Sequence, residues 1–235
     1  MKAMLFAAGL GTRLKPFTEN HPKALALVNE KTLLERNILY LKSFGIIEII
    51  INIHHFGNQI ISFLKENNNF GCNIQISDES NEVLETGGGL LKAQNFFTDE
   101  NFLVMNVDIL TKLNINNFIK FHQHKNALIS LAVSERESTR KLLFDKEMQL
   151  CGWKNFKTSE EIIAKPNIYK SLAFSGIHII SPDIFSLIEE RGKFSIMQVY
   201  MRLMCTQAIF GYEHSETIID VGKPESIEKA EKIFN

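Results

Sequence analysis

Two glycines and two cations near the N-terminus have the types and spacing of a phosphate-binding loop. Gly9 and Gly11 follow a short apolar run, and Arg13 and Lys23 come after them. Because glycine has no Cβ atom, backbone N–H groups of such a loop can approach an anion closely, and the chain can adopt a positive φ. The loop could therefore hold a phosphate chain. We expect the nucleotide-binding residues of this loop to be Ala8, Gly9, Gly11 and Thr12.

The residues after the glycines exclude two other phosphate-binding loops. A dinucleotide-binding fold requires a third small residue where Leu14 stands, and an acidic residue at the end of the second strand, which here ends at Ile53. A P-loop requires Gly-Lys-Ser/Thr at the start of a helix, but Gly11 is followed by Thr12 and Arg13. What remains is a loop with two separated cations.

A second glycine run lies in the segment 82–93, where Thr86 precedes Gly87, Gly88 and Gly89. One interpretation is a flexible turn before a helix. The other is a base-binding loop, because glycines let backbone amide and carbonyl groups meet the edge of a flat base. We favour the second interpretation, and we expect Thr86 and Gly87 to bind the base.

Two aspartates follow apolar strands and are candidate metal ligands. Asp108 ends a nearly unbroken apolar run that begins at Phe102, and Asp220 follows Ile218 and Ile219. Strands of this kind lie in the middle of parallel sheets, and ligands bind beyond their carboxyl ends. Alone, Asp220 would be an ordinary turn residue. Together the two aspartates supply two oxygen ligands, the number that Mg²⁺ typically takes from protein when phosphates supply others.

The elements that position these residues alternate between strands and helices. A helix over 32–44 follows the phosphate loop and leads into a strand over 46–53, which makes a right-handed βαβ unit with parallel strands. The further elements expected are strands over 73–77, 102–108, 127–133, 172–180 and a short strand from 218, and helices over 58–67, 115–121 and 196–204. This pattern predicts an α/β sandwich with a mostly parallel central sheet, in one domain spanning residues 1–235.

The second half of the chain contains less regular features. An edge hairpin is expected over 141–153, and a charged loop over 160–165. Ser175 and Gly176 interrupt the strand over 172–180, where an interior glycine marks either a close ligand or a bulge. Ser181 and Pro182 are expected to start a helix as N-cap and first residue.

Composition excludes several classes of partner. A chain of 235 residues with 45% hydrophobic residues can bury a substantial core, and the formal net charge of -1 gives no reason to expect a nucleic-acid or membrane partner. Three cysteines without CxxC spacing argue against a disulfide framework or zinc site, and no apolar run is long enough to span a membrane. We therefore expect a cytoplasmic protein. The sequence indicates no oligomeric state.

The segment Gly9–Pro16, taken together with Pro22 and Lys23, resembles the signature of sugar-1-phosphate nucleotidylyltransferases. The resemblance covers nearly the whole chain and is nearest to a subgroup containing N-acetylmuramate-1-phosphate uridylyltransferases and mannose-1-phosphate guanylyltransferases. It implies a three-layer Rossmann-like fold of the nucleotide-diphospho-sugar transferase type, and Mg²⁺-dependent formation of an NDP-sugar and pyrophosphate from an NTP and a sugar 1-phosphate. One departure is Val107, where the family usually has glycine.

The resemblance also implies roles for individual residues. Arg13 and Lys23 would be catalytic, and Asp108 and Asp220 would bind the metal. Lys154, Ser175 and Gly176 would bind the sugar, although Asn155 replaces the proline that usually follows this lysine. The substrates implied are UTP and N-acetylmuramate 1-phosphate. Three alternatives remain open: a mannose-1-phosphate guanylyltransferase activity, an activity like that of phosphocholine cytidylyltransferases, and a catalytically inactive sensor of nucleotide sugars.

Overall fold

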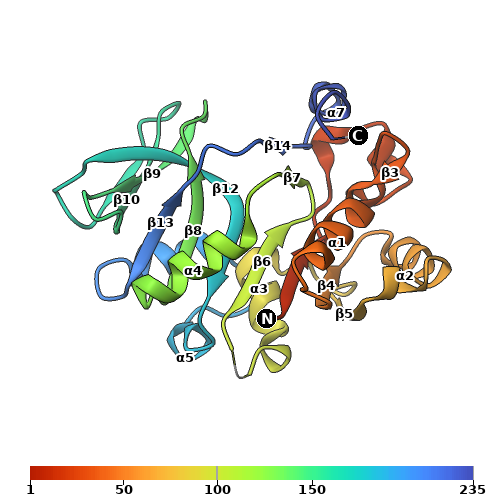
Figure 1. Cartoon of the computed structure of the whole chain (residues 1–235), viewed down its shortest axis with the longest axis horizontal. Coiled ribbons are helices and arrows are strands. Elements are labelled where there is room, and N and C mark those ends of the chain that lie inside the picture. The colour runs from red at the N-terminus through yellow and green to blue at the C-terminus, as the bar shows by residue number, and fades with distance from the viewer. Residues whose placement is uncertain (99, 235) are drawn as a thin grey trace.

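The computed structural model describes residues 1–98 and 100–234, and it consists of strands and helices that alternate along most of the chain (Figure 1). The strands are β1 Ala3–Phe6, β2 Leu27–Val28, β3 Lys31–Thr32, β4 Glu48–Ile53, β5 Asn73–Asp78, β6 Phe102–Asn106, β7 Ile109–Thr111, β8 Ile129–Ser134, β9 Arg140–Phe144, β10 Leu150–Asn155, β11 Glu161–Ile163, β12 Lys170–Ile180, β13 Ile209–Glu213 and β14 Ile218–Asp220. The α-helices are α1 Leu33–Ser43, α2 Gly57–Glu66, α3 Glu85–Lys92, α4 Ile115–Lys125, α5 Ile184–Leu187, α6 Ile196–Leu203 and α7 Pro224–Glu231.

The central sheet is mostly parallel, as expected. Strands β5, β4, β1 and β6 lie side by side in parallel register. β12 is antiparallel to both β6 and β8, and β13 is parallel to β8. β8 and β13 therefore run in the same direction as β1 and β6, and β12 alone among these strands runs against them. The carboxyl ends of the parallel strands consequently open on one edge of the sheet, where ligands bind in folds of this kind.

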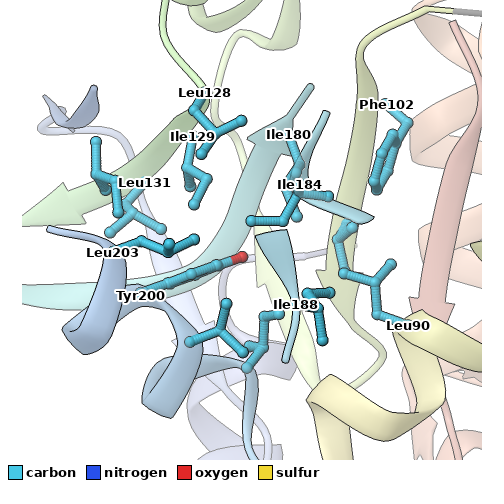
Figure 2. Close-up of a cluster of buried hydrophobic side chains, with 14 of the residues drawn as sticks. Leu90, Phe102, Leu128, Ile129, Leu131, Ile180, Ile184, Ile188, Tyr200 and Leu203 are labelled. Atoms are coloured by element: carbon cyan, nitrogen blue, oxygen red, sulfur yellow. The ribbon is translucent and has the colours of Figure 1, made fainter. Parts of the chain in front are cut away.

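Helices cover both faces of this sheet, which confirms the three-layer architecture. Successive side chains of a strand point to opposite faces. Leu5 of β1 packs with the helices α1, α2 and α4, whereas Met4 packs with α3, α5 and α6. Figure 2 shows the second of these cores, in which Leu90 of α3 lies in one buried cluster with Tyr200 and Leu203 of α6. The core thus fixes α3, which carries the second glycine run.

An arm of three antiparallel strands extends from the N-terminal half of β12. The expected hairpin is confirmed as β9 and β10, but it does not form the outer edge of the arm. The charged loop expected over 160–165 is wrong: residues Glu161–Ile163 form β11, which pairs with β10. Charged residues are common on edge strands because they face water, so charge did not indicate a loop here.

The start of helix α5 differs slightly from the expectation. The hydrogen bond from Ile184 N to Ser181 O opens a turn ahead of α5, whose cap residue is Asp183, two residues after the expected N-cap. Among the described residues, no helix is both long enough and apolar enough to cross a membrane.

Two buried histidines should make stability depend on pH. Burial lowers the pKa of His178, which contacts the Tyr200 hydroxyl at 2.6 Å, to about 3, and it lowers the pKa of His122 to about 4. Both values lie below the ordinary value of about 6.5. Below that pH the unfolded chain therefore binds protons that the native protein does not bind, and stability falls as the pH falls towards 4.

We expect the free energy of unfolding to decrease by about 2 kcal/mol per buried histidine between pH 7 and pH 5. Urea denaturation at the two pH values measures this decrease. For His178→Gln, the decrease in the free energy of unfolding between pH 7 and pH 5 should be about 2 kcal/mol smaller than for the wild type, because glutamine does not titrate. His21→Gln, at an exposed position, is the control and should behave like the wild type. If His178→Gln lost as much stability between pH 7 and pH 5 as the wild type, His178 would not be the titrating group.

Candidate active site

A cavity of about 440 Å³ lies beyond the carboxyl ends of β1, β4 and β6. Phe6 and Asn106, the last residues of β1 and β6, line it. The structure brings most of the sequence-predicted residues to this cavity. Those that line it are Ala8, Gly9, Gly11, Thr12, Arg13, Lys23, Thr86 and Asp108.

The phosphate loop is folded tightly against the segment that carries Lys23. Gly11 has a φ of +61°, and a Cβ atom there would lie 3.0 Å from Lys23 Cβ and 2.9 Å from Thr18 Cγ2. The Thr18 hydroxyl donates a hydrogen bond to Gly11 O at 3.0 Å. Glycine is therefore required at this position both by the left-handed backbone and by the close approach of Lys23. The other glycine of the loop, Gly9, has open space around its Cβ position.

Lys23 and Asp108 form an ion pair at the end of β6. Both side chains are largely buried, with relative exposures of 10% and 19%. The sequence assigned the lysine to a phosphate and the aspartate to a metal. The structure shows that this lysine and this aspartate are in direct contact. Each therefore partly neutralises the charge of the other in the cavity.

Asp220 is not among the described residues that line the cavity, but the chain brings it close to Asp108 and Arg13. β14 is antiparallel to β7, with Asp220 opposite Ile109, and Val221 N donates a hydrogen bond to Asp108 O at 2.8 Å. A Cβ atom on Gly222 would lie 2.6 Å from Asp220 Oδ1 and 2.8 Å from Arg13 Nη2. Because Gly222 has no side chain, the Asp220 carboxylate and the Arg13 guanidinium can both lie close to its backbone.

The residues present fit a hard divalent cation better than a transition metal. Asp108 and Asp220 offer carboxylate oxygens only, and no group of three or more His, Cys, Asp or Glu residues suited to a metal occurs within 1–98 and 100–234. Zinc sites take at least three nitrogen, sulfur or oxygen ligands from protein. Mg²⁺ takes one or two carboxylates and completes its shell with phosphate oxygens and water.

The second glycine run differs from the expected open loop. Gly87, Gly88 and Gly89 lie inside helix α3, which begins at Glu85. Gly87 N donates a hydrogen bond to Phe194 O at 2.9 Å, and a Cβ atom on Gly87 would lie 2.3 Å from the Phe194 ring. Phe194 therefore fills the space on the Cβ side of Gly87, and Gly87 is not among the described residues that line the cavity.

Thr86 remains at the cavity but is also tied to the protein. Its hydroxyl oxygen accepts a hydrogen bond from Ile196 N at 3.0 Å and so caps the start of α6. The residue lines the cavity together with Glu85 and Ser195. Its role in binding a base is supported by position alone.

Two buried polar residues of the cavity were missed by the sequence analysis. Asn52 Nδ2 donates to Glu79 Oε1 at 2.7 Å, and Asn52 Oδ1 accepts a hydrogen bond from Ala7 N at 2.8 Å. Glu79 Oε2 accepts from Leu84 N at 3.1 Å. The two side chains therefore connect the phosphate loop with the start of α3. A signal was present, because Asn52 is a polar residue between isoleucines near the end of an apolar strand and Glu79 directly follows the next strand.

The three predicted sugar-binding residues do not lie with the others. Ser175 is fully buried, and its hydroxyl contacts His214 Nε2 at 2.9 Å. Gly176 has a φ of +73° in a bulge of β12, and its Cβ position is 3.1 Å from Asn106 Nδ2. Lys154 pairs with Glu161 at 2.7 Å on the arm. None of the three is among the described residues that line the cavity.

The comparisons with known proteins identify the family. The family model described as nucleotidyl transferase matches residues 2–234. The chain belongs to the nucleotidyl transferase family. The expected resemblance to sugar-1-phosphate nucleotidylyltransferases is thereby confirmed, and the chain is an enzyme that transfers a nucleotidyl group.

Relatives within this family cover the chain almost completely. The N-acetylmuramate alpha-1-phosphate uridylyltransferase of Neisseria meningitidis serogroup B is 30% identical over 99% of this chain and 98% of its own. A probable mannose-1-phosphate guanylyltransferase of rice is 27% identical over 95% of this chain, but this alignment spans only 62% of the rice protein. The crystal structure of HddC from Yersinia pseudotuberculosis complexed with GMP-PN has a TM-score of 0.81, with 24% identity, and covers 100% of this chain and 99% of that chain. This last likeness shows the fold.

Gly87→Ala should reduce thermal stability, because the new methyl group overlaps the Phe194 ring and its carbonyl oxygen. Overpacking of this kind costs about 1–3 kcal/mol, and it should appear as a melting temperature lower by several degrees. Gly9→Ala is the matched control, since its Cβ position is open, and its melting temperature should equal that of the wild type. Equal melting temperatures for both variants would contradict the close contact at Gly87.

Proposed function

We propose that this nucleotidyltransferase transfers a uridylyl group from UTP to N-acetylmuramate 1-phosphate in a Mg²⁺-dependent reaction, releasing pyrophosphate. The observation that supports transfer to a phosphate is the meeting of two cations, Arg13 and Lys23, with two carboxylates, Asp108 and Asp220, at one end of the parallel sheet. The choice of substrates rests on the relative from Neisseria meningitidis, which matches this chain over nearly the full length of both proteins.

The reaction requires no nucleophile or general base from the enzyme. The attacking group is a phosphate oxygen of the sugar 1-phosphate, and a phosphomonoester is mostly dianionic at neutral pH because its second pKa is about 6. The oxygen attacks the α-phosphorus of UTP in line, the bond to the β-phosphate oxygen breaks, and pyrophosphate leaves with the bonding electrons. Histidines near the cavity need no part in this step.

The main barrier is the repulsion between two anions. At an effective dielectric constant of about 20 and a separation of about 5 Å, each pair of unit charges repels by roughly 3 kcal/mol. Asp108 and Asp220 would hold Mg²⁺, whose positive charge would offset this repulsion. Lys23 would stabilise the α-phosphate and the attacking oxygen. Arg13, whose guanidinium lies beside Gly222, would stabilise the departing pyrophosphate.

Buried polar contacts keep the phosphate loop in place during this step. Ala7 N is hydrogen bonded to Asn52, and Asn52 is hydrogen bonded to Glu79. Both side chains are at most 2% exposed, so these contacts are protected from competition by water. A preorganised loop loses little free energy to reorganisation as charge develops in the transition state.

Asp108→Asn and Asp220→Asn should each lower turnover by about 100-fold or more, by analogy with the removal of one charge-stabilising group from other active sites. Neutral amides bind Mg²⁺ poorly, so the Mg²⁺ concentration for half-maximal rate should rise as well. Rates are measured by pyrophosphate release over a Mg²⁺ titration. Glu19→Gln, an exposed carboxylate near the loop, is the control and should keep the wild-type titration. A normal rate at limiting Mg²⁺ would remove either aspartate from the site.

The substrate assignment predicts the outcome of a grid of four nucleoside triphosphates against several phosphomonoesters. Turnover should be highest with UTP and N-acetylmuramate 1-phosphate. Preference for GTP with mannose 1-phosphate would instead favour the activity named for the rice relative. Preference for CTP with phosphocholine would assign the chain to a different acceptor. Nucleotide-sugar binding without turnover in any combination would identify a sensor and refute the proposed reaction.

A further inference from the structure

A second cavity, of about 710 Å³, opens on the same edge of the sheet as the active site. Ser134 and Glu213, the last residues of β8 and β13, line it, together with Arg136, His214 and Ile218. β8 and β13 run in the same direction as β1 and β6, so their carboxyl ends face the same side. In Figure 1, the chain runs from the upper end of β13 to β14, which lies above β7.

Strand β14 connects this second cavity with the active site. Its first residue, Ile218, lines the second cavity, and its last residue, Asp220, lies beside Asp108. The carboxylate of Asp220 also influences Arg136: burial lowers the pKa of the Arg136 guanidinium, and the negative charge of Asp220 opposes that effect. Asp220 thus lies near Arg13, across Gly222, and is close enough to Arg136 to offset part of the effect of burial on its pKa.

The polar groups of the second cavity lack protein partners to an unusual degree. Four buried side-chain polar atoms have no hydrogen-bond partner within the described part of the chain, and three of these belong to this cavity. They are Ser134 Oγ, Arg136 Nε and His214 Nδ1. Because buried polar atoms are nearly always hydrogen bonded in native proteins, a cluster of exceptions beside a cavity indicates that water or a ligand in the cavity supplies the missing partners.

Arg136 is the cation of this cavity whose N–H groups are only partly used by contacts within the protein. Its Nη2 donates a hydrogen bond to Phe174 O at 2.7 Å, which fixes the guanidinium against β12. A guanidinium has five N–H donors in a planar fork, so this contact uses a minority of them. Lys154, which the sequence placed at the sugar phosphate, is instead paired with Glu161 on the arm.

The carboxylates of the cavity limit where an anion can bind. Glu213 is paired with Lys170 at 2.7 Å, Glu216 Oε2 lies 3.6 Å from His214 Nδ1, and Glu135 is exposed. These acids would repel an anion in most of the cavity, but they accept hydrogen bonds from hydroxyl groups readily. The arrangement therefore suits a ligand with many hydroxyl groups and one anionic group held at Arg136.

We infer that Arg136 binds an anionic group of the acceptor substrate, either its phosphate or a carboxylate on the sugar, while the rest of the second cavity accommodates the sugar hydroxyls. The inference rests on the proposed function, since it assigns the acceptor half of that reaction. It places the acceptor in the second cavity, which Ile218 lines at the start of β14, the strand that ends at Asp220. It also assigns to Arg136 the role that the sequence gave to Lys154.

The test compares Arg136→Gln and Arg136→Lys with Arg140→Gln, which removes an exposed cation four residues away. With UTP saturating, Arg136→Gln should raise the KM for N-acetylmuramate 1-phosphate by 10-fold or more, and it should leave the KM for UTP within 2-fold of the wild type. Arg136→Lys should restore part of the loss, because a point charge replaces a planar fork. Arg140→Gln should leave both KM values unchanged.

N-acetylglucosamine 1-phosphate distinguishes the two sources of the anionic group, because it lacks the carboxylate of N-acetylmuramate. Equal losses with both acceptors identify the phosphate as the group bound by Arg136. A loss confined to N-acetylmuramate 1-phosphate identifies the carboxylate. A melting temperature that falls together with increases in both KM values would show that Arg136 is structural, and this would overturn the inference, as would unchanged KM values.

Binding of the two sugar phosphates to the protein, measured by calorimetry, tests the inference independently of the proposed reaction. Wild-type protein that binds a sugar phosphate but turns over no substrate pair refutes the proposed function alone. In that case, loss of binding in Arg136→Gln, with binding retained in Arg140→Gln, still supports the inference. Wild-type protein that binds neither sugar phosphate overturns it.

Discussion

The pairing of β14 with β7 is the interaction on which the active site depends. It joins residues more than 100 positions apart in the sequence and brings Asp220 next to Asp108 through the hydrogen bond from Val221 N to Asp108 O. The same short strand places Gly222 against Arg13. Without this pairing, the candidate site would keep Arg13, Lys23 and Asp108 but lose Asp220, the second of its two aspartates.

The parallel block of the sheet supplies the second constraint. Strands β1, β4 and β6 are almost fully buried, so their register is set by packing on both faces. Polar residues begin where the strands end, and there Asn52 and Glu79 bind backbone N–H groups of the neighbouring loops. The buried hydrophobic layers therefore determine the position of the loops, and a small polar network determines their conformation.

Sequence reasoning located the phosphate loop and both aspartates because each follows an apolar strand, and strand ends in such folds converge. It was less successful where contacts between distant segments decide the structure. Nothing near Gly87 in the sequence indicates that Phe194 fills the space beside it. The pairing of Lys154 with nearby Glu161 was missed because a loop was expected where β11 pairs with β10. Arg136 was missed because its surroundings come from β8, β12 and β14.

The three glycines of α3 have a consequence for local stability. Each glycine in a helix interior costs about 1 kcal/mol relative to alanine, and an isolated helix of eight residues is already too short to persist in water. α3 is therefore helical because Leu90 is buried in the core and because Phe194 and Glu79 lie against its backbone. The conformation of this wall of the cavity therefore depends on the neighbouring chain around Phe194 and on the core, more than on the helix propensity of its own residues.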